Sequence, residues 1–340
     1  MLEKQKYIPS PQEFLEKIPM TPALKRVKEK RDAEIRAVIS GKSEKLLVIV
    51  GPCSAHAHAP TLNYITRLGK LQERLSEKLV IVPRIYTNKP RTRGVGYQGM
   101  FLQPDFDGEA DIVRGIESVR KLHISVMEET GLTGADEMLY PENTPYVDDL
   151  VSYFAVGARS VENPLHRQSA SGLDVPVGMK NPTSGNLNSL MDSVFAAQNA
   201  QVFKYGEYQV RSAGNPYAHA VLRGGMDGNG AFQPNYGREA VAKISELYAD
   251  GGFCNPAVIV DCNHSNSGKQ HLKQLSIARE VTALRGADKD YRKIVKGLMI
   301  ESFLEEGSDP MGTVFGKSIT DPCIGWADTE RLLQELAESV

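Results

Sequence analysis

Short apolar runs, eight in all, recur along the chain, and each ends at or just before a polar residue able to bind a metal ion or an anion. Stretches with helical periodicity lie between most of these runs, which is the alternation expected of βα units. In a (β/α)8 barrel the catalytic groups lie at the carboxyl ends of the strands and in the loops that follow. We therefore predict an α/β chain folded as a (β/α)8 TIM barrel with its chemistry at one rim. The eight polar residues are Cys53, Arg84, Glu137, Arg159, Lys180, Arg223, His264 and Glu301.

The barrel is expected to occupy residues 45–340, behind an N-terminal extension of residues 1–44. In the extension, Pro9, Ser10 and Pro11 precede one helical stretch. Thr21 and Pro22 are typical of the N-cap and first position of a second helix, which is predicted to stop at Gly41. The extension is open to three interpretations: a solvated decoration, an oligomer contact or a regulatory arm.

Two segments of the barrel need a decision. Residues 144–154 (TPYVDDLVSYF) have a helical pattern, so a helix is predicted there. Between residues 200 and 223, both AQVFKY and AVLR have the composition of strands, separated by a loop rich in Gly, Pro and Tyr. We assign AVLR to the sixth barrel strand and AQVFKY to a short extra β ribbon in front of it.

Composition excludes several classes of protein. The 340 residues carry a formal net charge of −2, which gives no reason to expect nucleic acid or an anionic membrane as a partner. No apolar run approaches the ~20 residues of a membrane-spanning helix, and the N-terminus lacks the apolar core of a secretory signal. Four cysteines at unrelated spacings do not indicate a disulfide framework, so a cytoplasmic protein is expected.

Four of the rim residues form a chemically coherent set of metal ligands: Cys53, His264, Glu301 and Asp321. One thiolate, one imidazole and two carboxylates suit a borderline divalent ion such as Mn, Fe, Co or Zn. Cys262 lies two residues before His264, so strand alternation places both on one face, and we expect Cys262 to pack in the core.

The basic residues at the strand ends predict sites for anions. Arg84, Arg159, Lys180 and Arg223 each end an apolar strand, where an unpaired cation is strongly disfavoured and a bound phosphate or carboxylate would stabilise it. The run Lys89, Pro90, Arg91, Thr92 adds a second basic group after the second strand. Two groups indicate either two anionic substrates or one such site and one cluster that balances local carboxylates.

The motifs that carry these residues resemble those of one family. GPCS (51–54), KPRT (89–92), GAR (157–159), GMKNPTSG (178–185), LRGG (222–225), DCNHSNSGKQ (261–270), ESFLEEG (301–307) and GKSITDPCIGW (316–326) follow in order. From about residue 45 to its end the chain resembles the type I 3-deoxy-D-arabino-heptulosonate 7-phosphate (DAHP) synthases, of the class of the enterobacterial and yeast enzymes. The resemblance implies a transferase of the shikimate pathway that condenses phosphoenolpyruvate with erythrose 4-phosphate and releases phosphate. It also implies a homodimer or homotetramer.

The same resemblance implies roles for individual residues. The divalent metal would be held by Cys53, His264, Glu301 and Asp321. Phosphoenolpyruvate would meet Arg159, Arg223 and the backbone of Ala158 at its phosphate, and Arg84 and Lys180 at its carboxylate. Erythrose 4-phosphate would be positioned by Lys89, Arg91 and Thr92. Glu137 would orient the attacking water, His264 would also belong to the catalytic group, and either Lys180 or Lys89 would donate a proton.

Three features depart from the family pattern. Ala57 stands where an Asp is usual, the loop after KPRT is one residue longer, and the segment between Phe203 and Arg223 is shortened. In regulated relatives that segment helps to bind an aromatic amino acid, so weak or absent inhibition is predicted here. The departures leave one alternative within the fold, a paralogue of specialised metabolism that uses a different aldose phosphate. A catalytically silent barrel is the rival from another class, and retention of the charged residues argues against it.

Overall fold

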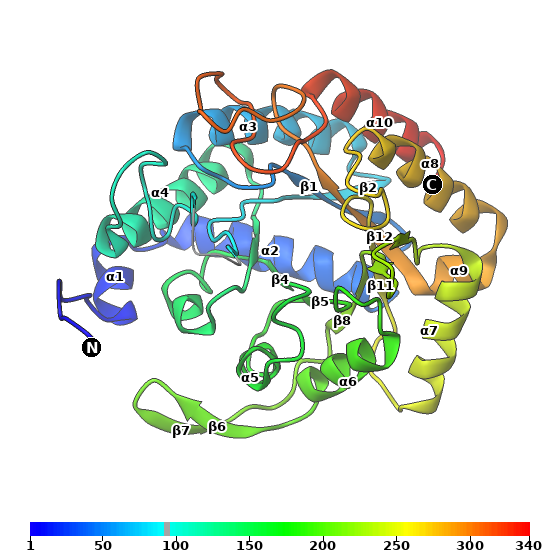
Figure 1. Cartoon of the computed structure of the whole chain (residues 1–340), viewed down its shortest axis with the longest axis horizontal. Coiled ribbons are helices and arrows are strands. Elements are labelled where there is room, and N and C mark those ends of the chain that lie inside the picture. Colours follow the sequence, from blue (N-terminus) through cyan, green and yellow to red (C-terminus); the bar gives the residue numbers. More distant parts are fainter. Residues whose placement is uncertain (92–95) are drawn as a thin grey trace.

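The computed structural model describes residues 1–91 and 96–340, and it has the predicted barrel architecture. Eight parallel strands form one sheet, in the order β2-β1-β12-β11-β8-β5-β4-β3. An isolated bridge between Arg84 and Ala135 joins its two outer strands and closes the barrel (Figure 1). The strands are β1 (Leu46–Gly51), β2 (Leu79–Pro83), β3 (Ala135–Glu137), β4 (Tyr153–Val156), β5 (Val177–Lys180), β8 (Ala218–Leu222), β11 (Val258–Asp261) and β12 (Val295–Glu301).

Helices surround this sheet and cover its outer face (Figure 1). They are α3 (His58–Leu75), α4 (Ile112–Thr130), α5 (Pro164–Ser171), α6 (Leu187–Gln198), α7 (Arg238–Asp250), α8 (Lys273–Ala287), α9 (Lys289–Ile294) and α10 (Trp326–Glu338). In the part of the chain that the structure describes, no helix is both long and apolar enough to cross a bilayer.

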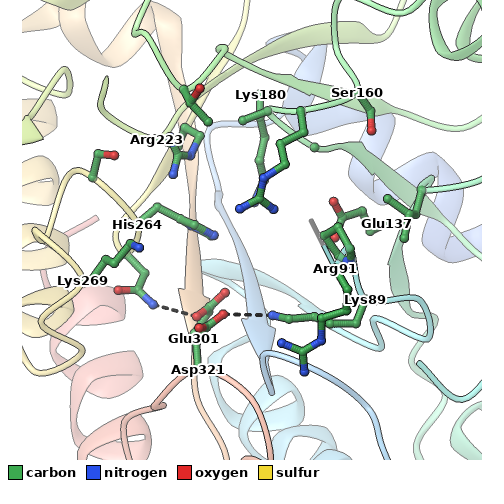
Figure 2. Close-up of a pocket in the computed structure, with 18 of the residues that line it drawn as sticks. Lys89, Arg91, Glu137, Ser160, Lys180, Arg223, His264, Lys269, Glu301 and Asp321 are labelled. Atoms are coloured by element: carbon green, nitrogen blue, oxygen red, sulfur yellow. Dashed lines mark hydrogen bonds and ion pairs between the residues drawn. The ribbon is translucent and has the colours of Figure 1, made fainter. Parts of the chain in front are cut away.

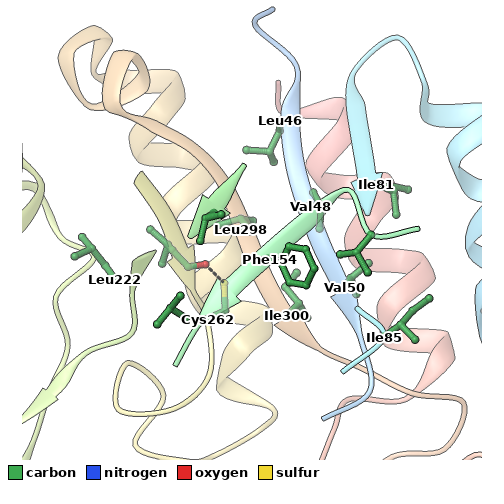
Figure 3. Packing of buried hydrophobic residues seen from close by; sticks show 14 of the residues in the cluster. Leu46, Val48, Val50, Ile81, Ile85, Phe154, Leu222, Cys262, Leu298 and Ile300 are labelled. Atoms are coloured by element: carbon green, nitrogen blue, oxygen red, sulfur yellow. Dashed lines mark hydrogen bonds between the residues drawn. The ribbon is translucent and has the colours of Figure 1, made fainter. Parts of the chain in front are cut away.

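Strand alternation divides the core in two. Val48 and Val50 of β1 point outward and pack with Leu298 and Ile300 of β12 under the helices (Figure 3). Leu47 and Ile49, which alternate with them along β1, belong to a separate cluster inside the barrel, with Met299 and Tyr153. Both faces of the parallel strands are therefore buried, which accounts for their continuous apolar runs.

The N-terminal extension forms two helices, α1 (Pro11–Lys17) and α2 (Pro22–Ile39), with Ser10 and Thr21 as their N-caps. Gly41 follows α2 with φ +74°, as predicted for a helix stop. Ile35, Val38 and Ile39 of α2 are fully buried in the same cluster as the inward residues of β1. The helix therefore packs against the floor of the barrel, and its predicted role in oligomer contact or regulation stays a prediction.

The segment before the sixth barrel strand behaves as predicted. Residues 202–205 and 208–211 pair as an antiparallel hairpin of β6 (Val202–Tyr205) and β7 (Tyr208–Arg211), while AVLR begins within β8. Figure 1 shows this hairpin projecting from the barrel. The hairpin borders a pocket of about 370 Å3, which Phe203 and Arg211 help to line. The shortened segment between Phe203 and Arg223 therefore still supplies part of a pocket wall. Weak inhibition by aromatic amino acids stays a prediction.

One predicted helix is wrong. Residues 144–154 do not form an α-helix, because the segment divides between the 3-10 helix η1 (Pro141–Tyr146), turns and strand β4. Tyr153 and Phe154 pack in the barrel wall as strand residues, and this tertiary packing outweighs the helical pattern. The helix of this βα unit is α5, which comes after β4.

Candidate active site

A pocket of about 350 Å3 opens at the carboxyl ends of the barrel strands (Figure 2). Most of the residues singled out from the sequence line it, and Cys53 is buried behind it in contact with Asp321. Thr92 lies outside the described residues. The predicted residues that line the pocket are Arg84, Lys89, Arg91, Glu137, Ala158, Arg159, Lys180, Arg223, His264, Glu301 and Asp321.

Arg159 and Arg223 form a cationic wall of the pocket without a carboxylate partner. Arg223 is 7% exposed, and in the part of the chain that the structure describes its guanidinium makes one long hydrogen bond, 3.5 Å from Nη1 to the Gly224 carbonyl oxygen. Burial lowers the pKa of Arg223, Asp261 opposes this, and the nearby charge of Arg159 lowers the pKa further. Among residues 1–91 and 96–340, no carboxylate lies within ion-pair distance of either guanidinium. Arg223 is buried and Arg159 is exposed, and two such neighbouring like charges are stabilised when an anion binds between them.

Arg84 and Glu301 form a buried ion pair at the ends of β2 and β12, which flank β1. Arg84 Nη2 donates to Glu301 Oε1 at 2.8 Å, and Nε donates to the Pro52 carbonyl oxygen at 3.1 Å. Asn263 Nδ2 donates to the other carboxylate oxygen of Glu301 at 2.6 Å. Arg84 Nη1 is buried without a hydrogen-bond partner among the described residues, which leaves this donor for a ligand in the pocket.

Lys180 and His264 meet the carboxylate of Asp261, a residue that the sequence reasoning missed. Lys180 Nζ and His264 Nδ1 each lie 2.9 Å from Asp261 Oδ2, although the histidine contact is poorly aligned as a hydrogen bond. Burial would raise the pKa of Asp261, but the charges of His264 and Lys180 hold it well below the usual range. With Nδ1 facing a carboxylate, Nε2 is the nitrogen of His264 that is available to a ligand.

The face assigned to Cys262 has to be corrected. β11 ends at Asp261, and His264 lies three residues later with φ +51°, so strand alternation does not extend from Cys262 to His264. Cys262 packs in the cluster between the barrel and the helices (Figure 3), whereas Asp261 points toward the pocket side. The prediction that Cys262 is a core residue is confirmed. The sequence did carry a signal for Asp261 as a site residue, because this carboxylate stands at the end of an apolar strand.

Cys53, Lys89 and Asp321 form a third cluster. Lys89 Nζ lies 2.7 Å from Cys53 Sγ and 2.9 Å from Asp321 Oδ2, and Figure 2 shows the Lys89 and Asp321 side chains facing each other. Burial and then the charge of Glu301 raise the pKa of the Cys53 thiol to about 11. Burial by itself lowers the pKa of Lys89, but the charges of Cys53 and Asp321 outweigh this effect and raise the pKa above its usual value. The ammonium thus contacts two of the predicted metal ligands, which also contact each other at 3.2 Å.

These contacts bear on whether the residues fit a metal ion. In the described part of the chain, no three His, Cys, Asp or Glu side chains are gathered closely enough to hold one. Glu301 accepts hydrogen bonds from Arg84 and Asn263, and Lys89 contacts both Cys53 and Asp321. The donor set nevertheless suits a borderline divalent ion, and the Lys89 ammonium stands in for a cation at two of the four donors. The residues fit the metal chemically, with side-chain rotations still needed for them to converge.

Glu137, at the end of β3, faces the loop after β4. A Cβ on Gly157 would lie 2.3 Å from Glu137 Oε1, so only glycine leaves room for this carboxylate. Asp136, the residue before it, accepts hydrogen bonds from the backbone N–H groups of Thr87 (2.9 Å) and Glu137 (2.7 Å). Burial raises the pKa of Asp136 to about 7. This buried carboxyl therefore ties Glu137 to the segment that leads to Lys89.

The structure adds pocket residues that no strand-end pattern indicated. Lys269 lines the pocket from a loop with left-handed backbone, where its own φ is +62°. Asn263 reaches Glu301, as described above. The hydroxyl-bearing residues of the lining, all in loops, are Ser160, Thr183 and Ser265.

Comparison with known proteins agrees with this geometry. A family model described as the DAHP synthetase I family matches residues 21–334. The chain is 39% identical over 332 residues to the Trp-sensitive phospho-2-dehydro-3-deoxyheptonate aldolase of Enterobacter agglomerans, covering 95% of this chain and 92% of that relative. It is 39% identical over 342 residues to the Phe-sensitive enzyme of Escherichia coli K12, covering 97% and 93%. The solved phospho-2-dehydro-3-deoxyheptonate aldolase of Francisella tularensis SCHU S4 superimposes with a TM-score of 0.92 at 31% identity, covering 100% and 98%.

Proposed function

The chain belongs to the DAHP synthetase I family, and from this premise we propose that it condenses phosphoenolpyruvate with erythrose 4-phosphate to form DAHP and inorganic phosphate. The observation that carries the proposal is the pair of neighbouring guanidinium groups, buried Arg223 and exposed Arg159, without a carboxylate partner in the described chain. A phosphate monoester supplies the charge that this wall lacks. Lys89 and Arg91 supply a second cationic group for a second phosphorylated substrate.

In this proposal each substrate group has a place. The phosphate of phosphoenolpyruvate binds Arg159, Arg223 and the Ala158 backbone, and its carboxylate binds Lys180 and the free Nη1 of Arg84. Arg91, whose Nε donates to the Tyr97 carbonyl oxygen at 2.8 Å, directs its remaining nitrogens to the phosphate of erythrose 4-phosphate with Thr92. Lys89 then moves from Cys53 and Asp321 to contact erythrose 4-phosphate.

The proposed chemistry forms one C–C bond and one C–O bond from water, and it breaks the C–O bond between C2 and the phosphate. C3 of phosphoenolpyruvate attacks the aldehyde carbon, whose oxygen takes up a proton from Lys180 or Lys89. Water oriented by Glu137 adds at C2 and returns one proton to the lysine. Phosphate then leaves from C2 by C–O cleavage, taking the remaining hydroxyl proton as the C2 carbonyl forms. A divalent ion held by Cys53, His264 Nε2, Glu301 and Asp321 would supply Lewis acidity at the aldehyde oxygen. The cations of the pocket are preorganised around the negative charge of the departing phosphate, and the Glu137 carboxylate offsets the positive charge that develops at C2.

Phosphate release tests the proposal. With both substrates and Mn(II), we expect release that stops when the metal is chelated and is absent when either substrate is omitted. Arabinose 5-phosphate and ribose 5-phosphate serve as competing acceptors for the paralogue alternative. No release with erythrose 4-phosphate would contradict the activity, and undiminished release under chelation would contradict the metal.

A further inference from the structure

A second groove, of about 760 Å3, lies at the opposite end of the barrel from the active site. Its walls come from α7 and α9, which lie side by side (Figure 1), and from the amino end of β12. The turn after α2 contributes Ser40 and Gly41. Val241 and Tyr248 of α7 and Ile294 of α9 give the groove an apolar wall. None of these residues belongs to the active-site pocket.

Lys296 is a half-buried cation of this groove. It lies at the second position of β12, its side chain is half-buried, and within the described chain it makes no hydrogen bond or ion pair. A Cβ on Gly41 would lie 3.3 Å from Lys296 Nζ, so the ammonium is held beneath the turn that follows α2. A long cationic side chain in this position is desolvated without a compensating anion.

The surroundings of Lys296 are themselves cationic. Arg285 of α8 is buried and donates to the Val295 carbonyl oxygen, and Lys293 of α9 lines the groove. Burial lowers the pKa of Lys296, and Arg285 and Lys293 lower it further. Glu44 opposes them, but it is 83% exposed and already paired with Arg292 at 2.7 Å. The cluster has more positive charge than the nearby carboxylates neutralise.

Three carboxylates also line the groove, and each is either already paired or exposed at the rim. Asp288 pairs with Arg238 through one oxygen and caps α9 through the other, accepting from the N–H groups of Asp290 and Tyr291. Glu246 and Asp290 are exposed at the rim. The basic end of the groove is therefore at Lys293 and Lys296, next to the apolar wall.

We propose that this groove binds a small organic anion, whose carboxylate or phosphate group pairs with Lys296 and Lys293 and whose apolar body packs on Val241 and Ile294. The anion stabilises the half-buried ammonium, and the wall between α7 and α9 selects against small inorganic ions. The site is separate from the proposed synthase activity.

Chemical footprinting of lysines tests this assignment on the whole chain. Limited acetylation is followed by mass spectrometry, with benzoate as the probe, phenyl phosphate as its phosphate counterpart, and benzyl alcohol and inorganic phosphate as controls. We expect benzoate or phenyl phosphate to slow acetylation of Lys296 at least threefold and to leave Lys243 unchanged, because Lys243 is exposed on α7 outside the groove. Which of the two protects more strongly identifies the anionic group.

A variant separates this site from the active-site pocket, which also has cations that can attract benzoate. In fluorine NMR titrations with 4-fluorobenzoate, Lys296→Met should weaken the groove component of binding at least tenfold, whereas Lys243→Met should leave it unchanged. In Arg223→Ala, protection of Lys296 should persist. The proposal is overturned if benzyl alcohol or inorganic phosphate protects Lys296 as well as the aromatic anions, or if no anion protects it. Should Lys296→Met fail to fold, the wild-type footprint alone decides.

Discussion

Replacing Arg223 with methionine should make the free protein more stable while it weakens phosphoenolpyruvate binding. The guanidinium is nearly buried, has no carboxylate partner among the described residues and makes one long contact to a carbonyl. Its backbone N–H keeps its 2.9 Å bond to Asn181 Oδ1 whatever the side chain. Arg223→Met therefore removes a desolvated charge and loses little else.

The expected magnitudes follow from these contacts. Exchange of buried charge for a well-packed apolar side chain stabilises proteins by about 1–4 kcal/mol, or roughly 2 °C in melting temperature for each kcal/mol in a chain of this size. Loss of one charge-assisted contact to the phosphate should lower kcat/KM by about ten- to a hundredfold. Lys180→Met is the matched control, because Lys180 is paired with Asp261 at 2.9 Å. It should destabilise the protein by roughly 3 kcal/mol, since it strips a buried carboxylate of a partner.

Melting of the two variants and the wild type is measured with and without phosphoenolpyruvate. Ligand at a hundred times its Kd stabilises the wild type by about 2.7 kcal/mol, and this increment should largely vanish in Arg223→Met. Opposite shifts of the two ligand-free variants are the signature of an unpaired and a paired cation in one pocket. If Arg223→Met lowers the melting temperature as much as Lys180→Met does, the argument that Arg223 lacks compensation is refuted.

Three other predictions concern the metal, the second substrate and pH. Chelation should abolish turnover and Mn(II) or Co(II) should restore it, while Cys53→Ala should lose metal in equilibrium dialysis and keep its circular dichroism; full activity of metal-free enzyme would contradict the ligand set. Arg91→Ala should mainly raise the apparent KM for erythrose 4-phosphate, by about ten- to a hundredfold, in steady-state assays, and an effect confined to phosphoenolpyruvate would reverse the assignment of the pocket. His123 is buried, and neither ring nitrogen has a hydrogen-bond partner within residues 1–91 and 96–340; burial and then the charge of Arg120 lower its pKa to about 3. Because the unfolded chain binds this proton below about pH 6.5 and the folded chain does not, stability should fall by roughly 2 kcal/mol from pH 7 to pH 5 on this account. His123→Leu should remove that part of the decline in urea titrations, and an unchanged decline would show that other groups cause it.

Residues at strand ends were predictable because apolar runs end where the barrel meets its rim. Arg84, Lys180 and Glu301 were found in this way, and the structure places them within one pocket. Their pairing was harder to predict, since it depends on which strands are neighbours. β1 lies between β2 and β12, so the ends of those two strands meet across Gly51 and bring Arg84 to Glu301.

Positions beyond the strand ends followed weaker rules. Asp261 was not predicted as a site residue, because the ligand prediction in this segment considered Cys262 and His264, which follow it. Lys269 and Asn263 lie in a loop whose left-handed residues no hydrophobic pattern encodes. The helix predicted at residues 144–154 was wrong for a related reason. Tyr153 and Phe154 pack in the barrel wall as strand residues, and the residues that they pack against lie far away in the sequence.

The closure of the barrel between β2 and β3 rests on little backbone pairing. One bridge, Arg84 to Ala135, spans this seam, with the bond from the Ile85 N–H to the Ala135 carbonyl oxygen at 2.8 Å, whereas β1 and β12 pair over five residues. Asp136 substitutes for the missing ladder by accepting the Thr87 N–H. Breathing of the barrel should therefore begin at this seam, where the Ile85 amide would exchange its hydrogen sooner than amides of β1. Arg84 and Glu137 lie on the two sides of the seam, so the most easily opened line of the wall borders the active-site pocket.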